Sequence, residues 1–313
     1  MLEEWGGKRY NSFGVHLRRL FGERVHRVSL DAGFTCPNRD GTLGTGGCIF
    51  CDAGGSRAGY VNPKTPVEEQ LRSGMEIISK TTGAKKFIAY FQAFSNTYAP
   101  PETLETLYYS VQKFPDVVGI AISTRPDLVP DEILDLIEKI AVQKYVWLEL
   151  GIQTMKEETL RRLNRGHGVQ QNIDAIRRAK LRPHINILAH MILGLPDETD
   201  TEIIMNARMI SELGVHGVKM HHLYVVENTV LANLYREGKA KVYEDVEDYA
   251  HIAVRFLENL RPDIIVHRLH GFATSGLIAP SWTSNRFLGT QKIEELLNKY
   301  NTYQGKYYNS PHF

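Results

Sequence analysis

Six short apolar runs alternate with amphipathic stretches along most of this chain, and this alternation constrains the fold more than any other feature. The runs are rich in β-branched and aromatic residues, which favour strands, and they span residues 25–32, 87–94, 117–124, 145–153, 185–195 and 217–226. Between them, apolar residues recur at helical spacing in 66–80, 102–114, 131–141, 169–180 and 200–214. Such short crossovers predict a parallel sheet. We therefore expect an α/β fold, an incomplete (β/α)6 TIM-like barrel.

The pattern changes after about residue 241. A long amphipathic stretch at 246–260 precedes a predicted seventh strand at 264–271, and the tail contains one more expected helix. We divide the chain into an N-terminal extension (1–24), a barrel core (25–240) and a C-terminal extension (241–313) that we expect to close the barrel.

The composition is that of a globular protein with a large core, because 42% of the 313 residues are hydrophobic and 23% are charged. The sequence has no apolar run of about eighteen residues, the length that a transmembrane helix needs. Its first residues lack the apolar stretch of a secretory signal. These features predict a cytoplasmic protein with no membrane partner.

The net charge is only +1, which by itself does not indicate a nucleic-acid partner. Two segments are more basic: 156–182 contains eight Lys and Arg against three Asp and Glu, and 1–30 contains six against three. Local bias of this kind attracts a phosphate backbone, but it is also typical of solvated helix faces. Both interpretations remain open.

All three cysteines lie on one glycine-rich loop after the first predicted strand, as Cys36, Cys48 and Cys51. Thiolates that converge in this way select zinc or an iron–sulfur cluster. A closed zinc site needs a fourth protein ligand, whereas a four-iron cluster held by three cysteines leaves one iron open. Unliganded thiols and one disulfide with a spare thiol are the less favoured alternatives.

Polar residues follow the predicted strands, at the edge where active sites of barrel folds collect. Single polar residues at strand ends are often only solvated, but here several strand ends face the cysteine loop. The candidates are Gln92, Ser95, Asn96, Thr97, Ser123, Thr124, Arg125, Asp127, Glu149, Gln153, Gly194, Leu195, Pro196, Lys219, His221 and His222.

The chain resembles the radical S-adenosylmethionine (SAM) superfamily, and within it the group similar to the Elongator catalytic subunit that includes the bacterial YhcC and YtqA proteins. The resemblance spans nearly the whole chain. It rests on the spacing of the cysteines and on motifs at 90–100, 122–129, 148–154, 163–167, 192–199 and 218–226.

This resemblance implies that Cys36, Cys48 and Cys51 ligate a [4Fe-4S] cluster and that SAM chelates the fourth iron. Electron transfer from the reduced cluster then cleaves SAM to methionine and a 5′-deoxyadenosyl radical, which abstracts a substrate hydrogen. An external electron donor of the flavodoxin or ferredoxin type is implied as well.

The resemblance also implies roles for residues around SAM. Phe50 corresponds to an aromatic position near the cluster and the adenine, and residues 92–97 meet the SAM amino group. Ser123, Arg125 and Gln153 are candidates for the ribose and carboxylate, Arg162 or Arg165 for the methionine carboxylate, and Gly194, Leu195, Pro196 and Leu223 for the adenine. Glu149 is a candidate for SAM or a substrate group. Several of these residues also have an alternative, purely structural role. Arg165 could cap a helix, Gln153 could bond to buried backbone groups, residues 194–196 could form a turn, and Glu149 could pair with an arginine.

Two features concern the second half of the chain. Histidines are frequent here, and His184, His190, His216, His221, His222, His267 and His270 make a second metal site conceivable but less favoured. His221 and His222 alternate along a strand, so only one of them faces the barrel interior. The relatives lead us to expect Gly-Asp-Ala-Pro after the seventh strand, whereas this chain has Gly271-Phe272-Ala273-Thr274. The missing carboxylate puts a substrate role of that loop in doubt.

The relatives centre on modified uridine at the wobble position of tRNA. The resemblance, together with the two basic segments, predicts an enzyme that converts 5-carboxymethylaminomethyluridine to 5-aminomethyluridine in tRNA. The alternatives are a radical SAM enzyme that acts on a small metabolite or peptide, and a non-catalytic zinc-binding adaptor.

Overall fold

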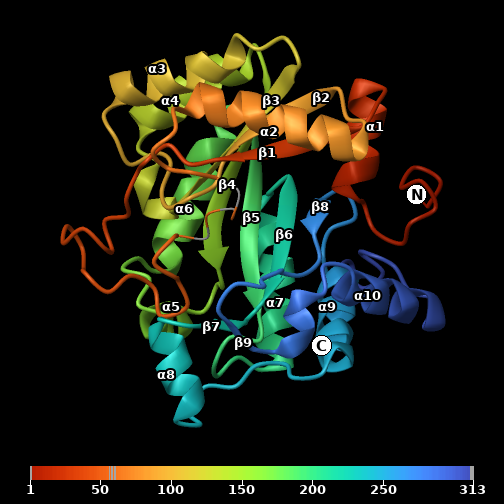
Figure 1. Ribbon diagram of the computed structural model, residues 1–313. Helices are drawn as coiled ribbons and strands as arrows, with labels where there is room; N and C mark the ends of the chain where they lie inside the picture. Colours follow the sequence, from red (N-terminus) through yellow and green to blue (C-terminus); the bar gives the residue numbers. More distant parts are fainter. Residues whose placement is uncertain (1, 56, 58, 60, 311–313) are drawn as a thin grey trace.

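Seven parallel strands form one curved sheet whose outer face is covered by helices, as the computed structural model shows (Figure 1). The structure describes residues 2–55, 57, 59 and 61–310. The strand order is β1-β2-β3-β4-β5-β6-β8. The strands are β1 Val25–Leu30, β2 Lys86–Phe91, β3 Val117–Thr124, β4 Tyr145–Gln153, β5 Ile185–Leu193, β6 Gly217–His222 and β8 Ile265–Arg268. The predicted incomplete barrel is therefore confirmed.

Helices follow the strands where the helical spacing predicts them: α2 Val67–Thr82, α3 Pro101–Gln112, α4 Asp131–Ala141, α6 Val169–Lys180 and α7 Asp200–Leu213. A short helix that was not predicted, α5 Glu157–Arg162, lies between β4 and α6. In α7, the Thr199 hydroxyl accepts the backbone N–H of Glu202, and the Glu202 carboxylate accepts the backbone N–H of Thr199. Reciprocal bonds of this kind satisfy two of the backbone donors that a helix start exposes. The helix ends at Gly214, which has a φ of 81°, a conformation that glycine adopts without strain.

The apolar run at 217–226 is not one strand, as expected, but two. β6 ends at His222, and a short strand, β7 Val225–Val226, pairs antiparallel with β9 Leu277–Ala279. The chain leaves the main sheet at Leu223, whose side chain packs in a separate apolar cluster. Burial of that side chain away from the sheet explains why an unbroken apolar run does not give an unbroken strand.

The amino end of the barrel is filled by apolar side chains. Helix α1 Phe13–Phe21 contributes Phe13 and Leu17, which pack with Trp147 and Leu188 from inside the barrel. We call this group the apolar plug; it also includes Ile88, Tyr90, Ala121 and Ile265. Because inward-facing residues alternate along each strand, the next inward position beyond Ile88, Ala121 and Trp147 is two residues closer to the carboxyl end.

The C-terminal part of the chain extends the sheet and packs beside it. β8, the predicted seventh strand, pairs parallel with β6. Helices α8 Val230–Arg236, α9 Val246–Glu258 and α10 Leu288–Lys299 complete this part. The Gln304 side chain accepts the backbone N–H of Asn11 and donates to the carbonyls of Arg261 and Ile264, so the two ends of the chain are joined.

The division at 24 and 240 stays a prediction, and residue 1 and residues 311–313 of the two extensions lie outside the described residues. In the part of the chain that the structure describes, no helix has both the length and the apolar character needed to span a membrane.

The apolar plug makes Trp147 a sensitive position for stability. Its side chain is fully buried, so we expect Trp147→Ala to lower the free energy of unfolding by about 3–5 kcal/mol, through lost burial and a cavity. Denaturant unfolding followed by circular dichroism measures this change. Val142→Ala on the exposed surface (64% exposed) serves as the control, and equal stability of both variants would contradict the proposed packing.

Candidate active site

The cysteine loop lies at the carboxyl edge of the sheet, between β1 and α2 (Figure 1). Three backbone hydrogen bonds hold it there: Ile49 N–H to the Leu163 carbonyl at 3.1 Å, Leu231 N–H to the Ile49 carbonyl at 2.8 Å, and Ser95 N–H to the Thr35 carbonyl at 3.3 Å. The loop is thereby tied to the ends of β2 and α5 and to the start of α8.

The three thiols are free, so the disulfide alternative is not realised. Cys48 is buried, and Cys36 and Cys51 are half-buried. Among the described residues, no three His, Cys, Asp or Glu side chains are close enough together to hold one metal ion. A zinc ion requires its thiolates at about 2.3 Å, so the loop as it stands does not fit a closed zinc site. In a four-iron cluster each cysteine binds a different iron, which does not require the thiols to converge on one point.

Positively charged and amide side chains surround the cysteines. Arg165 donates from Nη1 to Cys48 Sγ at 3.1 Å and from Nη2 to the Gly151 carbonyl at 2.7 Å. The Asn38 side chain lies 3.8 Å from the same sulfur. Donors of this kind stabilise thiolate sulfur and tune a cluster, so the residues around Cys48 fit a negatively charged cluster.

The environment of Cys51 points the same way. Arg39 donates to the backbone carbonyls of Cys51 and Asp52, at 2.8 and 2.5 Å. Burial raises the pKa of the Cys51 thiol to about 11, while the Arg39 guanidinium acts in the opposite direction. A bound metal deprotonates a thiol outright, so the group that fits this loop is one that binds thiolate.

Several predicted SAM-binding residues converge near Arg165. A Cβ atom at Gly151 would lie 3.0 Å from the Gln153 side-chain nitrogen and 3.2 Å from Arg165 Nη2. The side chains of Gln153 and Arg165 therefore both lie against the backbone of β4 at Gly151. Gln153 has a φ of 67°, an uncommon conformation that is frequent at functional sites.

The buried polar atoms of the predicted site that have no hydrogen-bond partner among the described residues include Gln153 Oε1, Asn96 Oδ1 and Arg125 Nη1. The rest of the Arg125 guanidinium is paired with Asp127 at 2.8 and 3.0 Å. Buried polar atoms normally have partners, so these three fit a polar ligand such as SAM at the carboxyl edge.

Apolar residues predicted for the adenine also lie together. Phe50, Leu195 and Leu223 belong to one cluster with Leu163. Gly194 has a φ of 82°, and a side chain there would meet the Tyr243 ring at 2.5 Å, so this position requires glycine. Pro196 is half-buried beside this cluster.

Other candidates serve the local structure. The Asn96 amide donates to the carbonyls of Ala93 and Ser123, and the Thr97 hydroxyl bonds to Thr124 and to the Leu128 carbonyl. Gln92 is half-buried and Ser95 is buried, and both hold the β2 end through backbone hydrogen bonds. These residues shape the turn after β2, which fits contacts to SAM through backbone atoms.

Arg162 is not brought to the cysteines. It is exposed and pairs with Glu158 and Asp197, whereas Arg165 is buried against Cys48. Of the two arginines, the geometry keeps Arg165 as the candidate at the cluster.

Ser123 and Glu149 lie deeper in the barrel than the cysteine loop, between that loop and the apolar plug. Glu149 pairs with Lys219 at 2.9 Å and with Arg27 at 3.1 Å, and Lys219 also donates to the Tyr90 hydroxyl at 2.6 Å. The Ser123 hydroxyl bonds to Glu149 and Tyr90, both at 3.1 Å. We call Arg27, Tyr90, Ser123, Glu149 and Lys219 the inner polar layer.

Electrostatics keep the inner polar layer charged. Burial alone would raise the pKa of Glu149, but Lys219 and Arg27 outweigh this effect and hold that pKa well below its usual range. Glu149 therefore remains ionised, and its pairing with an arginine, one of the expected alternatives, is realised.

Sequence reasoning did not identify Asn38, Arg39, Arg27 or Tyr90 as site residues. The sequence presents Arg27 only as part of a basic segment, yet its position two residues after Val25, which packs against the apolar plug, places both side chains on the same face of β1. Of the two neighbouring histidines, His221 lies against the His190 ring at 5.6 Å, and His222 packs on Trp282 at 4.0 Å, away from the lumen.

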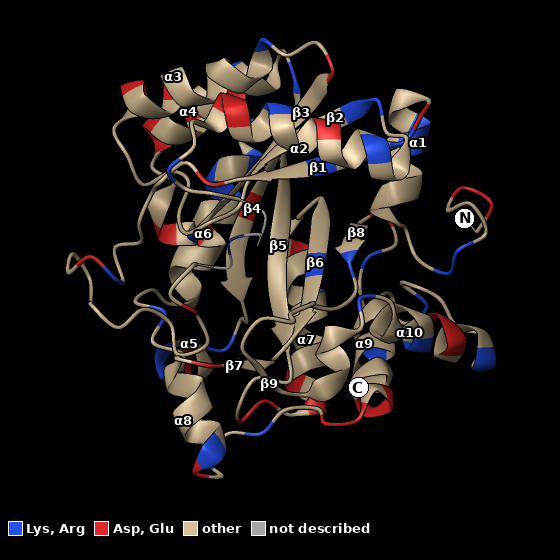
Figure 2. Cartoon of the chain, viewed as in Figure 1, with Lys and Arg blue, Asp and Glu red and all other residues tan. Residues whose placement is uncertain are grey.

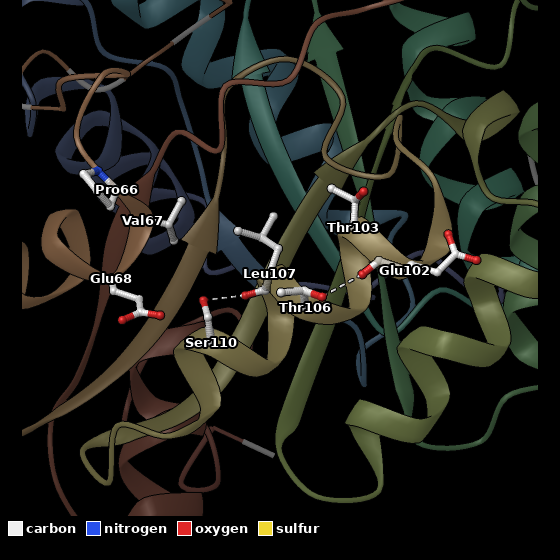
Figure 3. A pocket seen from close by; sticks show the side chains of 8 residues that line it. All are labelled: Pro66, Val67, Glu68, Glu102, Thr103, Thr106, Leu107 and Ser110. Carbon is white, nitrogen blue, oxygen red and sulfur yellow. Dashed lines mark hydrogen bonds between the residues drawn. The ribbon is translucent and has the colours of Figure 1, made fainter.

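A separate cavity of about 590 Å³ lies outside the barrel, between α2 and α3 (Figure 3). Its lining consists of Pro66, Val67, Glu68, Glu102, Thr103, Thr106, Leu107 and Ser110. It contains no residue of the predicted site and no cluster of reactive groups, so the chemistry belongs to the barrel.

Comparison with known proteins agrees with this geometry. Residues 39–210 match the model of the radical SAM superfamily, and residues 215–299 match the radical SAM C-terminal domain. The YtqA protein of Bacillus subtilis is 38% identical over 303 residues, which cover 96% of this chain and 93% of YtqA. The YhcC protein of Escherichia coli K12 is 37% identical over 295 residues, 94% of each chain.

The similarity to Elongator proteins is more partial. Elongator complex protein 3 of Saccharomyces cerevisiae is 30% identical over 142 residues, 44% of this chain and 25% of that protein. The archaeal Elp3 of Methanocaldococcus infernus superposes with a TM-score of 0.64 at 17% identity, over 92% of this chain and 68% of that one. The latter likeness shows the shared fold. The resemblance found in the sequence is confirmed, and the cofactors of the superfamily are a [4Fe-4S] cluster and SAM.

The cysteine loop generates a direct prediction. We expect Cys36→Ala, Cys48→Ala and Cys51→Ala each to abolish cluster binding, because no other thiol exists in the chain to replace the lost ligand. Iron and sulfide content after anaerobic reconstitution measures the loss, and circular dichroism reports whether the barrel remains folded. Thr42→Ala on the same loop is the control; a cysteine variant that retained a full cluster would refute the assignment.

Proposed function

Because the chain belongs to the radical SAM superfamily, we propose that it is a tRNA-modifying radical SAM enzyme that converts 5-carboxymethylaminomethyluridine at the wobble position to 5-aminomethyluridine. The observation that carries this proposal is the near full-length similarity to YtqA and YhcC, together with the Elongator-like sequence of the barrel. The polar lumen beneath the cysteine loop supports it, because the substrate side chain is itself polar.

When bound, the cluster and SAM would supply the hydrogen-abstracting chemistry of the superfamily. The carbon oxidised would be the methylene between the side-chain amine and the carboxylate. Its loss of two electrons in all, both accepted as SAM is converted to methionine and 5′-deoxyadenosine, would leave an imine, and addition of water would release glyoxylate and the aminomethyl product.

The chain's own residues supply position and electrostatics. We propose that Cys36, Cys48 and Cys51 hold the cluster with Arg165 and Asn38 beside Cys48. Around SAM we propose Phe50, Gln92, Ser95, Asn96, Thr97, Arg125, Gln153, Gly194 and Leu223, with the exposed Arg162 at the periphery. Ser123 and Glu149 would lie beneath SAM, in the inner polar layer. An external donor of the flavodoxin or ferredoxin type delivers the electron.

The wobble-uridine substrate is tested in cells. In a strain that lacks this chain, we expect tRNA to accumulate 5-carboxymethylaminomethyluridine and to lose the aminomethyl form and its derivatives. Mass spectrometry of tRNA nucleosides measures both, and the wild-type gene restores the profile whereas the Cys48→Ala gene does not. An unchanged wobble-uridine profile would rule the substrate out.

The basic segments contribute less free charge than their sequence indicates. Lys156, Arg161 and Arg182 pair with Glu202, Glu158 and Asp135 respectively, and in the view of Figure 2 acidic and basic residues are interspersed over the outer helices. Apart from Arg27, which belongs to the inner polar layer, the cations of 1–30 lie on the α1 side of the molecule, at the amino end of the barrel and away from the cysteine loop. Because these cations are already paired within the protein, the charge distribution favours the alternative to tRNA, a small metabolite or peptide substrate. The position of the unpaired cations relative to the cysteine loop distinguishes the two candidates.

Charge reversal at two ends of one segment separates the candidates. Lys156 precedes the short helix α5 and Arg161 lies in its last turn, at the carboxyl edge of the barrel, whereas Arg177 and Lys180 lie where α6 ends, at the opposite edge. We expect Lys156→Glu with Arg161→Glu to weaken tRNA binding roughly tenfold and to reduce its salt dependence, because the reversed charges repel phosphates near the site.

The matched control is Arg177→Glu with Lys180→Glu, which we expect to bind tRNA as the wild type does. Filter binding at several salt concentrations measures both variants, with iron content as the check on the site. If neither pair changed binding, the RNA surface would lie elsewhere; if the wild type itself showed no salt-dependent binding, the small-substrate candidate would be favoured.

A further inference from the structure

Arg268 brings a positive charge into the barrel that the protein itself does not neutralise. Arg27, Lys219 and Arg268 face the lumen from β1, β6 and β8, and Glu149 is the carboxylate that lies among them in the described structure. Glu149 is already shared between Arg27 and Lys219. Three cations around one carboxylate leave an excess of positive charge in a region of low dielectric.

A bulge in β8 directs Arg268 inward. Val218 pairs with Val266, but the next pair is Lys219 with Arg268, so His267 is an extra residue in β8. His267 nevertheless points into the barrel, where it bonds to Arg27 and stacks on Phe13. Because a bulge shifts the alternation of side chains by one position, both His267 and Arg268 face the lumen. Such bulges often re-aim a side chain next to an active site.

The Arg268 guanidinium lacks a partner. Its Nε is buried without a hydrogen bond, and the structure gives the side chain no ion pair among the described residues. The residue as a whole is only partly buried, although its Nε is buried. A buried charge is normally paired or hydrogen-bonded because its desolvation is costly. An unpaired, partly accessible arginine is therefore suited to a ligand anion.

The groups around Arg268 are donors and rings and not further carboxylates. His190 on β5 has a buried Nε2 with no partner, and burial holds the pKa of His190 well below its usual range. The neutral ring offers a hydrogen bond without adding charge. The charges of Arg268 and of Cys51 both act on the pKa of Tyr224, so this tyrosine lies on the side of Arg268 toward the cysteine loop.

We propose that Arg268 binds the carboxylate of the substrate, with His190 beside it, and so determines which substrates are accepted. The inference rests on the proposed function, in which the substrate carries a carboxymethylaminomethyl group and the product lacks its carboxylate. The planar guanidinium matches a carboxylate with two parallel hydrogen bonds. Binding the carboxylate there holds the adjacent carbon in the lumen, on the side that faces the cysteine loop, and the amine product loses this contact.

The first experiment uses a fragment and does not depend on RNA. Thermal unfolding of the reconstituted holoenzyme is measured with sarcosine, which carries the methylaminoacetate group of the side chain, and with sarcosinamide, which lacks the carboxylate. We expect sarcosine alone to raise the Tm of the wild type and of Arg255→Gln, a surface control on α9. Arg268→Gln is expected to abolish this rise. An equal rise in Arg268→Gln and wild type, or no rise in either, overturns the proposal.

The second experiment uses anticodon stem-loop RNAs that differ only in the wobble side chain. We expect the wild type to bind the carboxymethylaminomethyl RNA roughly tenfold more tightly than the aminomethyl RNA, and Arg268→Gln to bind the two about equally. If the wild type binds neither RNA, the proposed substrate fails while the sarcosine result still decides the role of Arg268.

Two controls accompany the Arg268→Gln measurements. SAM binding is measured in parallel, because a loss of SAM affinity in Arg268→Gln with unchanged RNA discrimination would assign the arginine to SAM and overturn the proposal. If Arg268→Gln does not fold, Arg268→Lys replaces it: a lysine keeps the charge but loses the two-pronged contact, so partial loss of discrimination is expected, and full retention overturns the proposal.

Discussion

The ion pairs of Glu149 with Lys219 and Arg27 are the interaction on which the interior of this barrel depends. They join β4 to β6 and β1 across the lumen, although these strands are not neighbours in the sheet. Removal of one partner of a buried pair costs roughly 3–5 kcal/mol, because a charge is left uncompensated. The lumen is thus divided into an apolar amino end, a charged middle and a carboxyl edge where the cysteine loop lies.

In the sequence, the polar residues at the strand ends form one undivided set of candidates. The structure divides them into two layers. At the carboxyl edge, Gln153, Asn96 and Arg125 offer unsatisfied polar atoms next to the cysteines. One layer deeper, Ser123 and Glu149 are committed to partners within the protein. The polar groups at the carboxyl edge and those of the inner polar layer therefore do not compete for the same partners.

Most of the fold was predictable because parallel strands buried on both faces appear as continuous apolar runs. The prediction of one strand at 217–226 was wrong, because apolar character alone does not show that the chain leaves the sheet at Leu223 and buries that side chain in a separate cluster. The site was predictable to the extent that it is local. The cysteine spacing identifies the loop directly, whereas the choice between Arg162 and Arg165 depends on where α5 ends.

That choice has a simple geometric cause. The helix ends at Arg162, and Asn164 follows with a φ of 54°, so the chain turns inward before Arg165. No spacing rule predicts a turn of this kind. The inward position of Arg268 was not predictable for a related reason. Strict alternation along β8 would place its side chain on the outer face, and only the pairing of β8 with β6 shows the bulge at His267.

The apolar plug has a consequence for the fate of a reactive intermediate. Phe13, Leu17 and Trp147 fill the amino end of the barrel with buried apolar side chains, so the barrel interior is approached from the carboxyl edge. A large substrate that covered the carboxyl edge would therefore separate the interior from water. A carbon radical formed inside is thereby shielded from solvent and stray reductants by a wall that was in place before the substrate arrived.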